Sequence, residues 1–191
     1  NPMEPGYDSF TLSDFTADVG GASFAIPSIV SGVERNAAGQ PTKFVTQPYS
    51  MTLKADAAGG EVGEALLQGL SVVGYEELEL KGASVASYDP DKDIVSFDAG
   101  SNYLELVDGA KFSFGGKIEG YSSYAKEAAT AFNFEDLAAG AEPDPTAMTD
   151  AMGKLTIHGF EFSIDDNSLL DRAFNAAATS QGADPAECKS Q

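Results

Sequence analysis

The chain has few of the residues from which catalytic and metal centres are usually built. Its 191 residues include one cysteine, one histidine and no tryptophan. A single cysteine excludes an intrachain disulfide framework, and a single histidine excludes a metal centre made of several histidines. With 42% hydrophobic residues the chain can still bury a core of its own, so folding does not require disulfides or metal.

Basic residues are scarce as well. The chain has 11 Lys and Arg against 30 Asp and Glu, for a formal net charge of −19, and its basic residues are scattered singly. Nucleic acids and anionic membrane surfaces require concentrated positive charge, so neither is an expected partner. The charge is compatible with high solubility, with cation binding or with a basic protein partner.

Long apolar runs are missing too. No stretch approaches the roughly 18 apolar residues of a transmembrane helix, and none has the pattern of a signal peptide. The sequence opens without an initiator methionine, so we expect a processed or trimmed chain, or a piece of a longer one. Low cysteine content and many small polar residues are compatible with an exported, periplasmic or extracellular protein.

The sequence contains no recognisable catalytic or cofactor-binding motif. The glycines of 115–120 have neither dinucleotide-binding nor phosphate-loop spacing. His158 lies between Ile157 and Gly159 with no nucleophile at a fixed spacing, which favours an incidental strand residue over a general base. We therefore expect no enzyme and no cofactor. The remaining catalytic alternative is a two-carboxylate hydrolase, with acids such as Asp165 and Asp166 brought together by the fold.

One acidic turn is a candidate metal site. Asp89, Asp91 and Asp93 are spaced so that a turn can direct their oxygens at calcium. The EF-hand template then fails, because Ile94 stands where the loop needs glycine and Gly100 where it needs glutamate. The competing interpretation is a β-turn between two strands, for which Asp-Pro is common.

Three segments share an alternation that changes phase. In each, apolar and polar residues alternate, and an Asp or Gly precedes a restart one position late; the segments are 9–18, 77–88 and 154–165. One extra residue in a strand returns the following side chains to the same face, which predicts β-bulges. The pattern fits true internal repetition and also chance similarity.

The remaining periodicities predict an α+β fold. Helical spacing of apolar residues occurs near 61–70, 122–139 and 167–182, and the start of a further helix follows Asp184. Strand patterns occupy 22–34 and 42–56, and a hairpin turns at Asp108-Gly109. We expect one domain over 1–191, with a largely antiparallel, bulged β-sheet and amphipathic helices packed on one face.

The segments GYEELEL, ASYDPDKDIVSF and LVDGAKFSFGGKIEG, taken together, resemble strand-repeat segments of uncharacterised exported proteins of Gram-negative bacteria. The resemblance covers about residues 70–120 and 150–182 and consists of strand and turn patterning. It implies export and a β-rich scaffold. It assigns no activity and no functional residue.

Two kinds of non-catalytic function fit these observations. The first expectation is an exported structural or protein-interaction domain, acting through a protein partner or self-association, because Ala-rich helices suit close packing on a sheet. The alternative is a carrier or binder of a lipid or other apolar ligand. The quantity that separates them is how far the helices cover a set of phenylalanines: Phe10, Phe15, Phe112, Phe114, Phe160 and Phe162.

Overall fold

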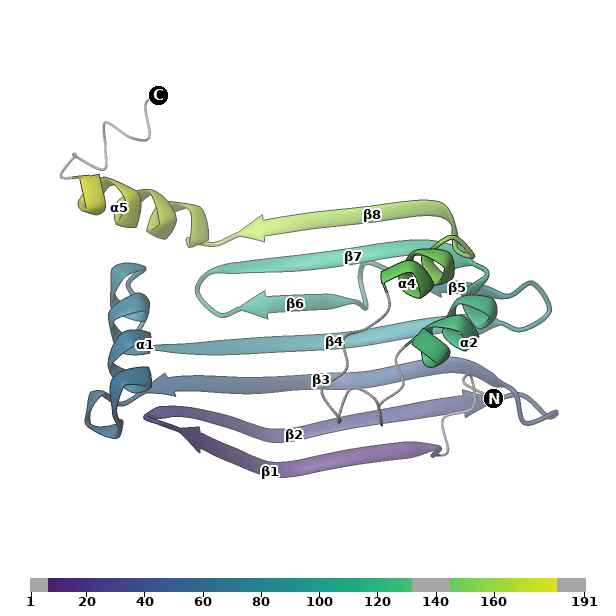
Figure 1. Cartoon of the computed structure of the whole chain (residues 1–191), viewed down its shortest axis with the longest axis horizontal. Coiled ribbons are helices and arrows are strands. Elements are labelled where there is room, and N and C mark those ends of the chain that lie inside the picture. Colours follow the sequence, from purple (N-terminus) through teal and green to yellow (C-terminus); the bar gives the residue numbers. More distant parts are fainter. Residues whose placement is uncertain (1–6, 132–144, 182–191) are drawn as a thin grey trace.

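A computed structural model of the chain describes residues 7–131 and 145–181, and it is an α+β structure dominated by one antiparallel sheet (Figure 1). The eight strands are β1 (Ser9–Val19), β2 (Ala22–Arg35), β3 (Pro41–Ala55), β4 (Glu77–Asp89), β5 (Ile94–Phe97), β6 (Tyr103–Leu106), β7 (Ala110–Glu119) and β8 (Thr156–Asp166). The helical elements are η1 (Ala57–Gly59), α1 (Glu61–Val72), α2 (Tyr121–Ala131), α4 (Pro145–Met152) and α5 (Leu169–Gln181). The predicted helix start after Asp184 and Cys188 lie outside the described residues.

The strands follow one another across the sheet nearly in chain order. The antiparallel neighbours β1, β2, β3 and β4 are adjacent, and β7 and β8 complete the other side. Between β4 and β7, the short strands β5 and β6 share one position, because each of them pairs with both β4 and β7. Within the described residues, β1 and β8 are therefore the two edges of the sheet.

A buried asparagine fills the gap between β5 and β6. The Asn102 side chain is fully buried and accepts from the backbone N–H of Val85 at 2.9 Å and from the hydroxyl of Ser84 at 3.0 Å. Its amide group donates to the carbonyls of Val85 and Asp98, at 2.9 and 2.7 Å. The side chain thus replaces ladder hydrogen bonds that β4 would otherwise lose at the interruption.

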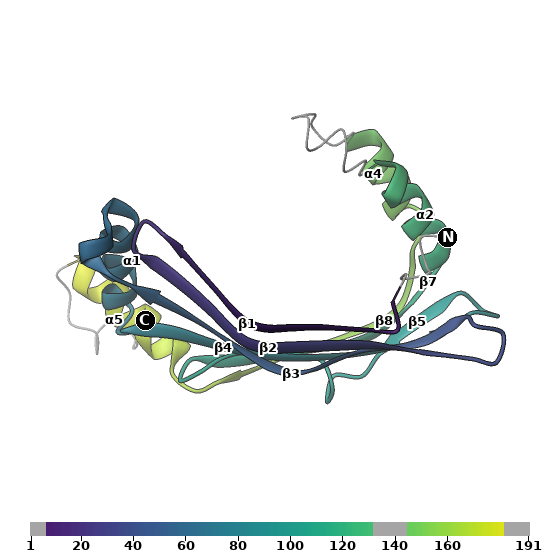
Figure 2. The same ribbon diagram turned by 90° about the horizontal axis from the view of Figure 1, so that it is seen from below.

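The helices lie at the two ends of the strands, and the predicted packing along one face is not seen in the described part of the chain. Figure 2 shows α1 and α5 at one end and α2 with α4 at the other, on a sheet bent into a shallow trough. Part of the reason is that the helices are much shorter than the strands. The 12 residues of α1 span about 18 Å, whereas the 15 residues of β3 span about 50 Å, so one helix can cover only part of a strand.

The connections fix where the helices begin. Gly21 and Gly63 bring the β1–β2 turn against the start of α1, with a hydrogen bond of 2.8 Å from the Gly63 N–H to the Gly20 carbonyl. A Cβ on Gly63 would lie 2.1 Å from the carbonyl oxygen of Asp56, so only glycine fits there. This contact holds α1 at the strand end instead of over the sheet.

At the same end of the sheet, α5 is joined to the end of α1. The Arg172 guanidinium donates to the carbonyls of Val73 and Gly74 and stacks on the Tyr75 ring at 4.2 Å. The backbone N–H groups of 167–169 all point at the Gly109 carbonyl in the β6–β7 turn. The predicted hairpin turn is confirmed, and Asp108 adopts the positive φ of 55° that such a turn requires.

Candidate functional site: the apolar face of the sheet

The strand register separates the side chains into two faces, because residues directly opposite each other in antiparallel strands point to the same side. One row of such partners crosses the sheet from β2 to β8: Val33, Phe44, Ala86, Phe97, Gly116 and Phe160. A second row contains Tyr49, Gly82, Leu104, Phe112 and Ile164. Gly116 and Phe112 are four residues apart in β7, so both rows lie on one side. We call this side the apolar face.

The opposite side is polar. One of its rows reads Ser50, Lys81, Glu105, Lys111 and Asp165, in which charges of opposite sign stand next to each other. Lys54 and Glu77, directly opposite each other, form an ion pair of 2.6 Å. Such exposed pairs contribute little stability, but they show that this side is built for contact with water.

Local irregularities keep the apolar face apolar along the length of the strands. In β1, Phe10 and Leu12 precede Asp14, which has a φ of 52°, and Phe15 restarts the alternation on the same side. β3 shifts register against β4 between Thr46 and Tyr49, at Pro48. Without these changes, half of each strand would turn its apolar residues to the polar side.

The bulge predicted in 154–165 is confirmed. Lys117 pairs with Gly159 and Ile118 with Ile157, which leaves His158 as the extra residue of β8. The Nε2 atom of His158 lies 2.6 Å from a carboxylate oxygen of Glu119 on the neighbouring strand. Both side chains are about half exposed, so the geometry is that of a surface pair beside a bulge.

The other two segments of the shared pattern behave differently. In β1 the kink at Asp14 occurs with no shift of register against β2. In β4 the predicted bulge at Gly82 and Ala83 is wrong, because the one extra residue lies opposite, in β3. Gly82 instead leaves space for the ring of Tyr49, whose hydroxyl would lie 2.7 Å from a Cβ at this position. The sequence pattern identified a crowded site but assigned it to the wrong strand.

The helices leave much of the apolar face uncovered. The exposure of six phenylalanines distinguishes an interaction role from binding of an apolar ligand. Of these, Phe10, Phe15, Phe160 and Phe162 are 49%, 41%, 74% and 52% exposed. Phe112 and Phe114 are half-buried. Ile157, Ile164 and Leu104 are exposed on the same side, and sequence reasoning missed them as functional candidates although the alternation contained them. Tyr88 and Val95 of this face pack against α2, and α2 stands on the concave side of the sheet in Figure 2, so the apolar face is the floor of the trough.

One end of the apolar face is closed by α2. Tyr88 and Val95 are buried, and Tyr121 and Ala125 of α2 pack against them together with Phe44. Asp93, which has a φ of 53°, accepts hydrogen bonds from the Tyr88 hydroxyl at 3.0 Å and from the Ser122 N–H and hydroxyl at 2.9 and 2.7 Å. Burial and the neighbouring Asp93 carboxylate raise the pKa of Tyr88 to about 12. Asp93 thus caps α2 and attaches it to the sheet.

The acidic turn forms the β4–β5 connection. The Asp89 carboxylate accepts from the backbone N–H groups of Asp91 and Lys92 and from the Lys92 ammonium at 2.7 Å. Hydrogen bonding to Lys92 lowers the pKa of Asp89. Residues 7–131 and 145–181 contain no group of three or more His, Cys, Asp or Glu that could hold a metal ion, so the geometry gives calcium no support.

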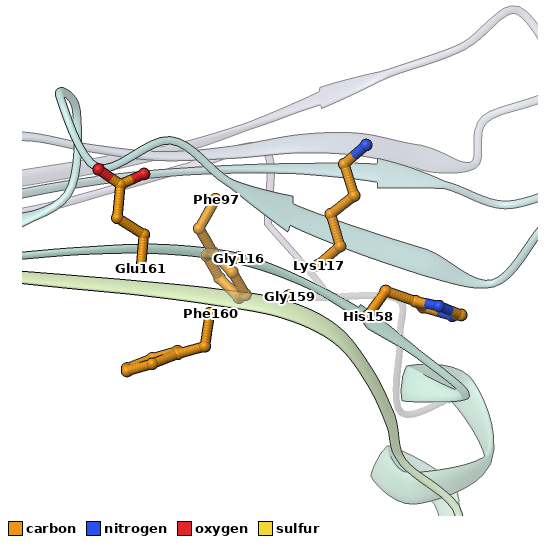
Figure 3. A pocket seen from close by; sticks show the side chains of 7 residues that line it. All are labelled: Phe97, Gly116, Lys117, His158, Gly159, Phe160 and Glu161. Atoms are coloured by element: carbon orange, nitrogen blue, oxygen red, sulfur yellow. The ribbon is translucent and has the colours of Figure 1, made fainter.

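An open pocket of about 310 Å³ lies beside Phe97, where Gly116 of β7 is its partner and β8 carries Gly159 opposite Lys117. Its lining includes Gly116, Gly159 and Phe160. Figure 3 shows Phe160 pointing to one side of the strands and Glu161 and Lys117 to the other. The pocket has a single carboxylate in its lining. Of the two acids suggested for hydrolysis, Asp166 accepts from the Leu170 N–H at 3.0 Å at the start of α5.

Comparisons with known proteins add little to these observations. The model of a family described as "Uncharacterized protein" matches residues 103–191, slightly less than half of the chain. No curated protein and no solved structure matches the chain. Among the described helices, none is long and apolar enough to span a membrane.

Proposed function

We propose that the protein is a non-catalytic binding protein that holds the acyl chains of a lipid, or a similar elongated apolar molecule, on its apolar face. One observation carries this proposal: strands from β1 to β8 direct their apolar residues to the same side, and the helices leave that side open. The largest apolar patch on a typical soluble monomer is about 300–600 Å², and it is often functional.

The energetics favour an acyl chain. Burying one methylene group completely contributes about 0.8 kcal/mol. An acyl chain on an open face buries about half of its surface, so ten methylenes supply about 4 kcal/mol before the costs of association. The trough has no charged row on its floor, whereas the opposite side of the sheet carries alternating charges. A ligand with apolar chains therefore gains binding free energy on the apolar face only.

The structural or interaction role, ranked first on sequence grounds, becomes the second proposal, because that ranking assumed helices that cover the phenylalanines. The exposed edge strand β8 favours it. We also propose that the protein acts outside the cytoplasm, on the composition and the resemblance to exported strand-repeat proteins. The absence of an enzymatic activity is part of the same proposal, since the one histidine is paired with Glu119 at an exposed bulge.

The test is native mass spectrometry of the 191-residue chain purified without detergent, together with titration with the fluorescent fatty acid cis-parinaric acid. We expect retained lipid adducts and a saturable rise in fluorescence that oleate reverses. Phe15→Glu and Leu104→Glu place a charge on the apolar face at residues that are 41% exposed. Each should weaken binding tenfold or more, since about 1.4 kcal/mol is a factor of ten.

Thr16→Glu is the matched control, because Thr16 is the exposed neighbour of Phe15 in β1 and points to the polar side. It should bind the fatty acid like the unmodified chain. If Thr16→Glu loses as much affinity as Phe15→Glu, or if neither adducts nor fluorescence are seen with the unmodified chain, the apolar face is not the binding site and the proposal fails.

A further inference from the structure

The edge strand β8 is open to another strand. All eleven of its residues are exposed, and among the strands within 7–131 and 145–181 it pairs with β7 alone. Natural edge strands are commonly protected by lysine, proline or short length, but Thr156–Asp166 contains neither lysine nor proline and is as long as β1. The bulge at His158 lies near one end and leaves 159–166 regular. This stretch is a template for strand addition.

We infer that two copies of this chain associate through β8, as antiparallel neighbours with Phe162 opposite Phe162 of the second copy. In this register Phe160 lies opposite Ile164, and Glu161 opposite Ser163. Shifting the centre to Glu161 places two glutamates against each other, and shifting it to Ser163 places Glu161 against Asp165. Like charges directly opposite destabilise a strand pair, so these two registers are disfavoured. Registers centred on Phe160 or Ile164 bring no like charges together but pair fewer residues of 159–166, so we expect the register centred on Phe162.

Strand pairing places apolar side chains of the two copies side by side. Phe160, Phe162 and Ile164 stay on the apolar face, where they are 74%, 52% and 54% exposed, and each contacts the residue directly opposite it in the second copy. Such cross-strand pairs contribute about 0.2–1 kcal/mol each, in addition to the backbone hydrogen bonds along the free edge of β8.

This inference specifies the partner of the interaction role proposed above and does not depend on lipid binding. Because opposite residues share a face, pairing Phe162 with its copy places the two apolar faces on one side of a continuous sheet. The dimer thus doubles the width of the apolar face. An association through the helices alone would not produce this alignment.

Cysteine cross-linking tests the register directly. In a Cys188→Ser background, Phe162→Cys places two thiols on opposite strands with Cα atoms about 4.5–5.5 Å apart, within disulfide range. Ile164→Cys is the matched control, on the same face and with the same exposure within two percentage points. Its two copies lie four residues out of register, about 14 Å apart. Mild oxidation should therefore cross-link Phe162→Cys at least tenfold faster than Ile164→Cys.

A second pair of variants distinguishes loss of dimerisation from loss of folding. Phe162→Lys and Phe162→Glu should each be monomeric, while an equimolar mixture should form heterodimers detectable by native mass spectrometry. Circular dichroism checks that each variant is folded. The inference is overturned if the unmodified chain is monomeric at its highest soluble concentration, or if Ile164→Cys cross-links as fast as Phe162→Cys. Native mass spectrometry reports lipid adducts and dimer mass separately, so failure of one proposal is distinguishable from failure of the other.

Discussion

Replacing Asn102 by alanine should destabilise the protein strongly. The substitution removes the partners of three backbone groups, the Val85 N–H and the carbonyls of Val85 and Asp98, in a site with no exposed surface. Each buried polar group left without a partner costs about 1–3 kcal/mol. At the lower end of this range, the three groups together give a loss of about 3 kcal/mol.

Urea unfolding followed by circular dichroism measures this loss. With a slope of about 1–3 kcal/mol per molar, the midpoint of Asn102→Ala should fall by 1 M or more. Ser101→Ala is the control in the same connection, since it removes only one exposed hydrogen bond to the Asp98 carboxylate. A midpoint for Asn102→Ala within the error of the Ser101→Ala value would refute the reasoning.

Asn102→Asp separates the donor role from the acceptor role. A carboxylate can still accept from Val85 and Ser84, but it faces two carbonyl oxygens to which the amide donated. In the folded state the protonated form is favoured, so the pKa of the introduced group rises above the unfolded value of about 3.9. Its stability contribution is then present below pH 4 and is lost as the pH rises. The deficit against the unmodified chain should grow from pH 4 to pH 7.

Three further outcomes are expected. Gly63→Ala in α1 should cost about 1–3 kcal/mol because the added methyl meets backbone atoms, whereas Gly69→Ala, with nothing within 4 Å, should gain about 0.5–1 kcal/mol in the same urea assay. The folded pKa of Tyr88 is raised to about 12 from 10.0, so its contribution is lost between pH 10 and 12; in alkaline unfolding, Tyr88→Phe should remove this part of the slope. Arg172→Ala should accelerate amide exchange in α5 while leaving β4 unchanged, because the guanidinium joins α5 to the end of α1.

Much of the sheet is predictable from sequence because its information is local. The Asp108-Gly109 turn and the phase change around His158 each depend on a few adjacent residues, and both appear as expected. The bulge assigned to Gly82 is wrong because a register shift belongs to a pair of strands. Alternation in β4 alone cannot show that the extra residue is in β3.

The position of the helices was not predictable, for a physical reason. An apolar stripe shows that a helix needs a partner, but it does not identify the partner. In α1 the stripe is only partly used, since Leu70 is buried while Val62 and Leu67 remain exposed. Contacts among Gly21, Gly63 and the Asp56 carbonyl decide where α1 lies, and these are close approaches of backbone that hydrophobic periodicity does not encode.

The residues of the candidate site were predictable from the sequence, but their exposure was not. The set of phenylalanines was identifiable from alternation, yet their exposure depends on where the helices pack. The acidic turn illustrates the same limit, because Asp93 meets Ser122, which is 29 residues away in the sequence, and so serves as a helix cap. Spacing within a turn cannot reveal a partner contributed by a distant element.

The near-sequential strand order has a consequence for how the chain folds. Almost every strand pairs with its predecessor, and the longer returns, such as that from β7 to β8, pass through helices of their own. Loop closure is therefore inexpensive at each step, and such local topologies fold faster than sheets with distant pairings. The sheet can grow by one strand at a time from any hairpin as a nucleus, as repeat arrays do. Loss of a terminal strand should accordingly shorten the sheet and leave the remaining strands cooperative among themselves.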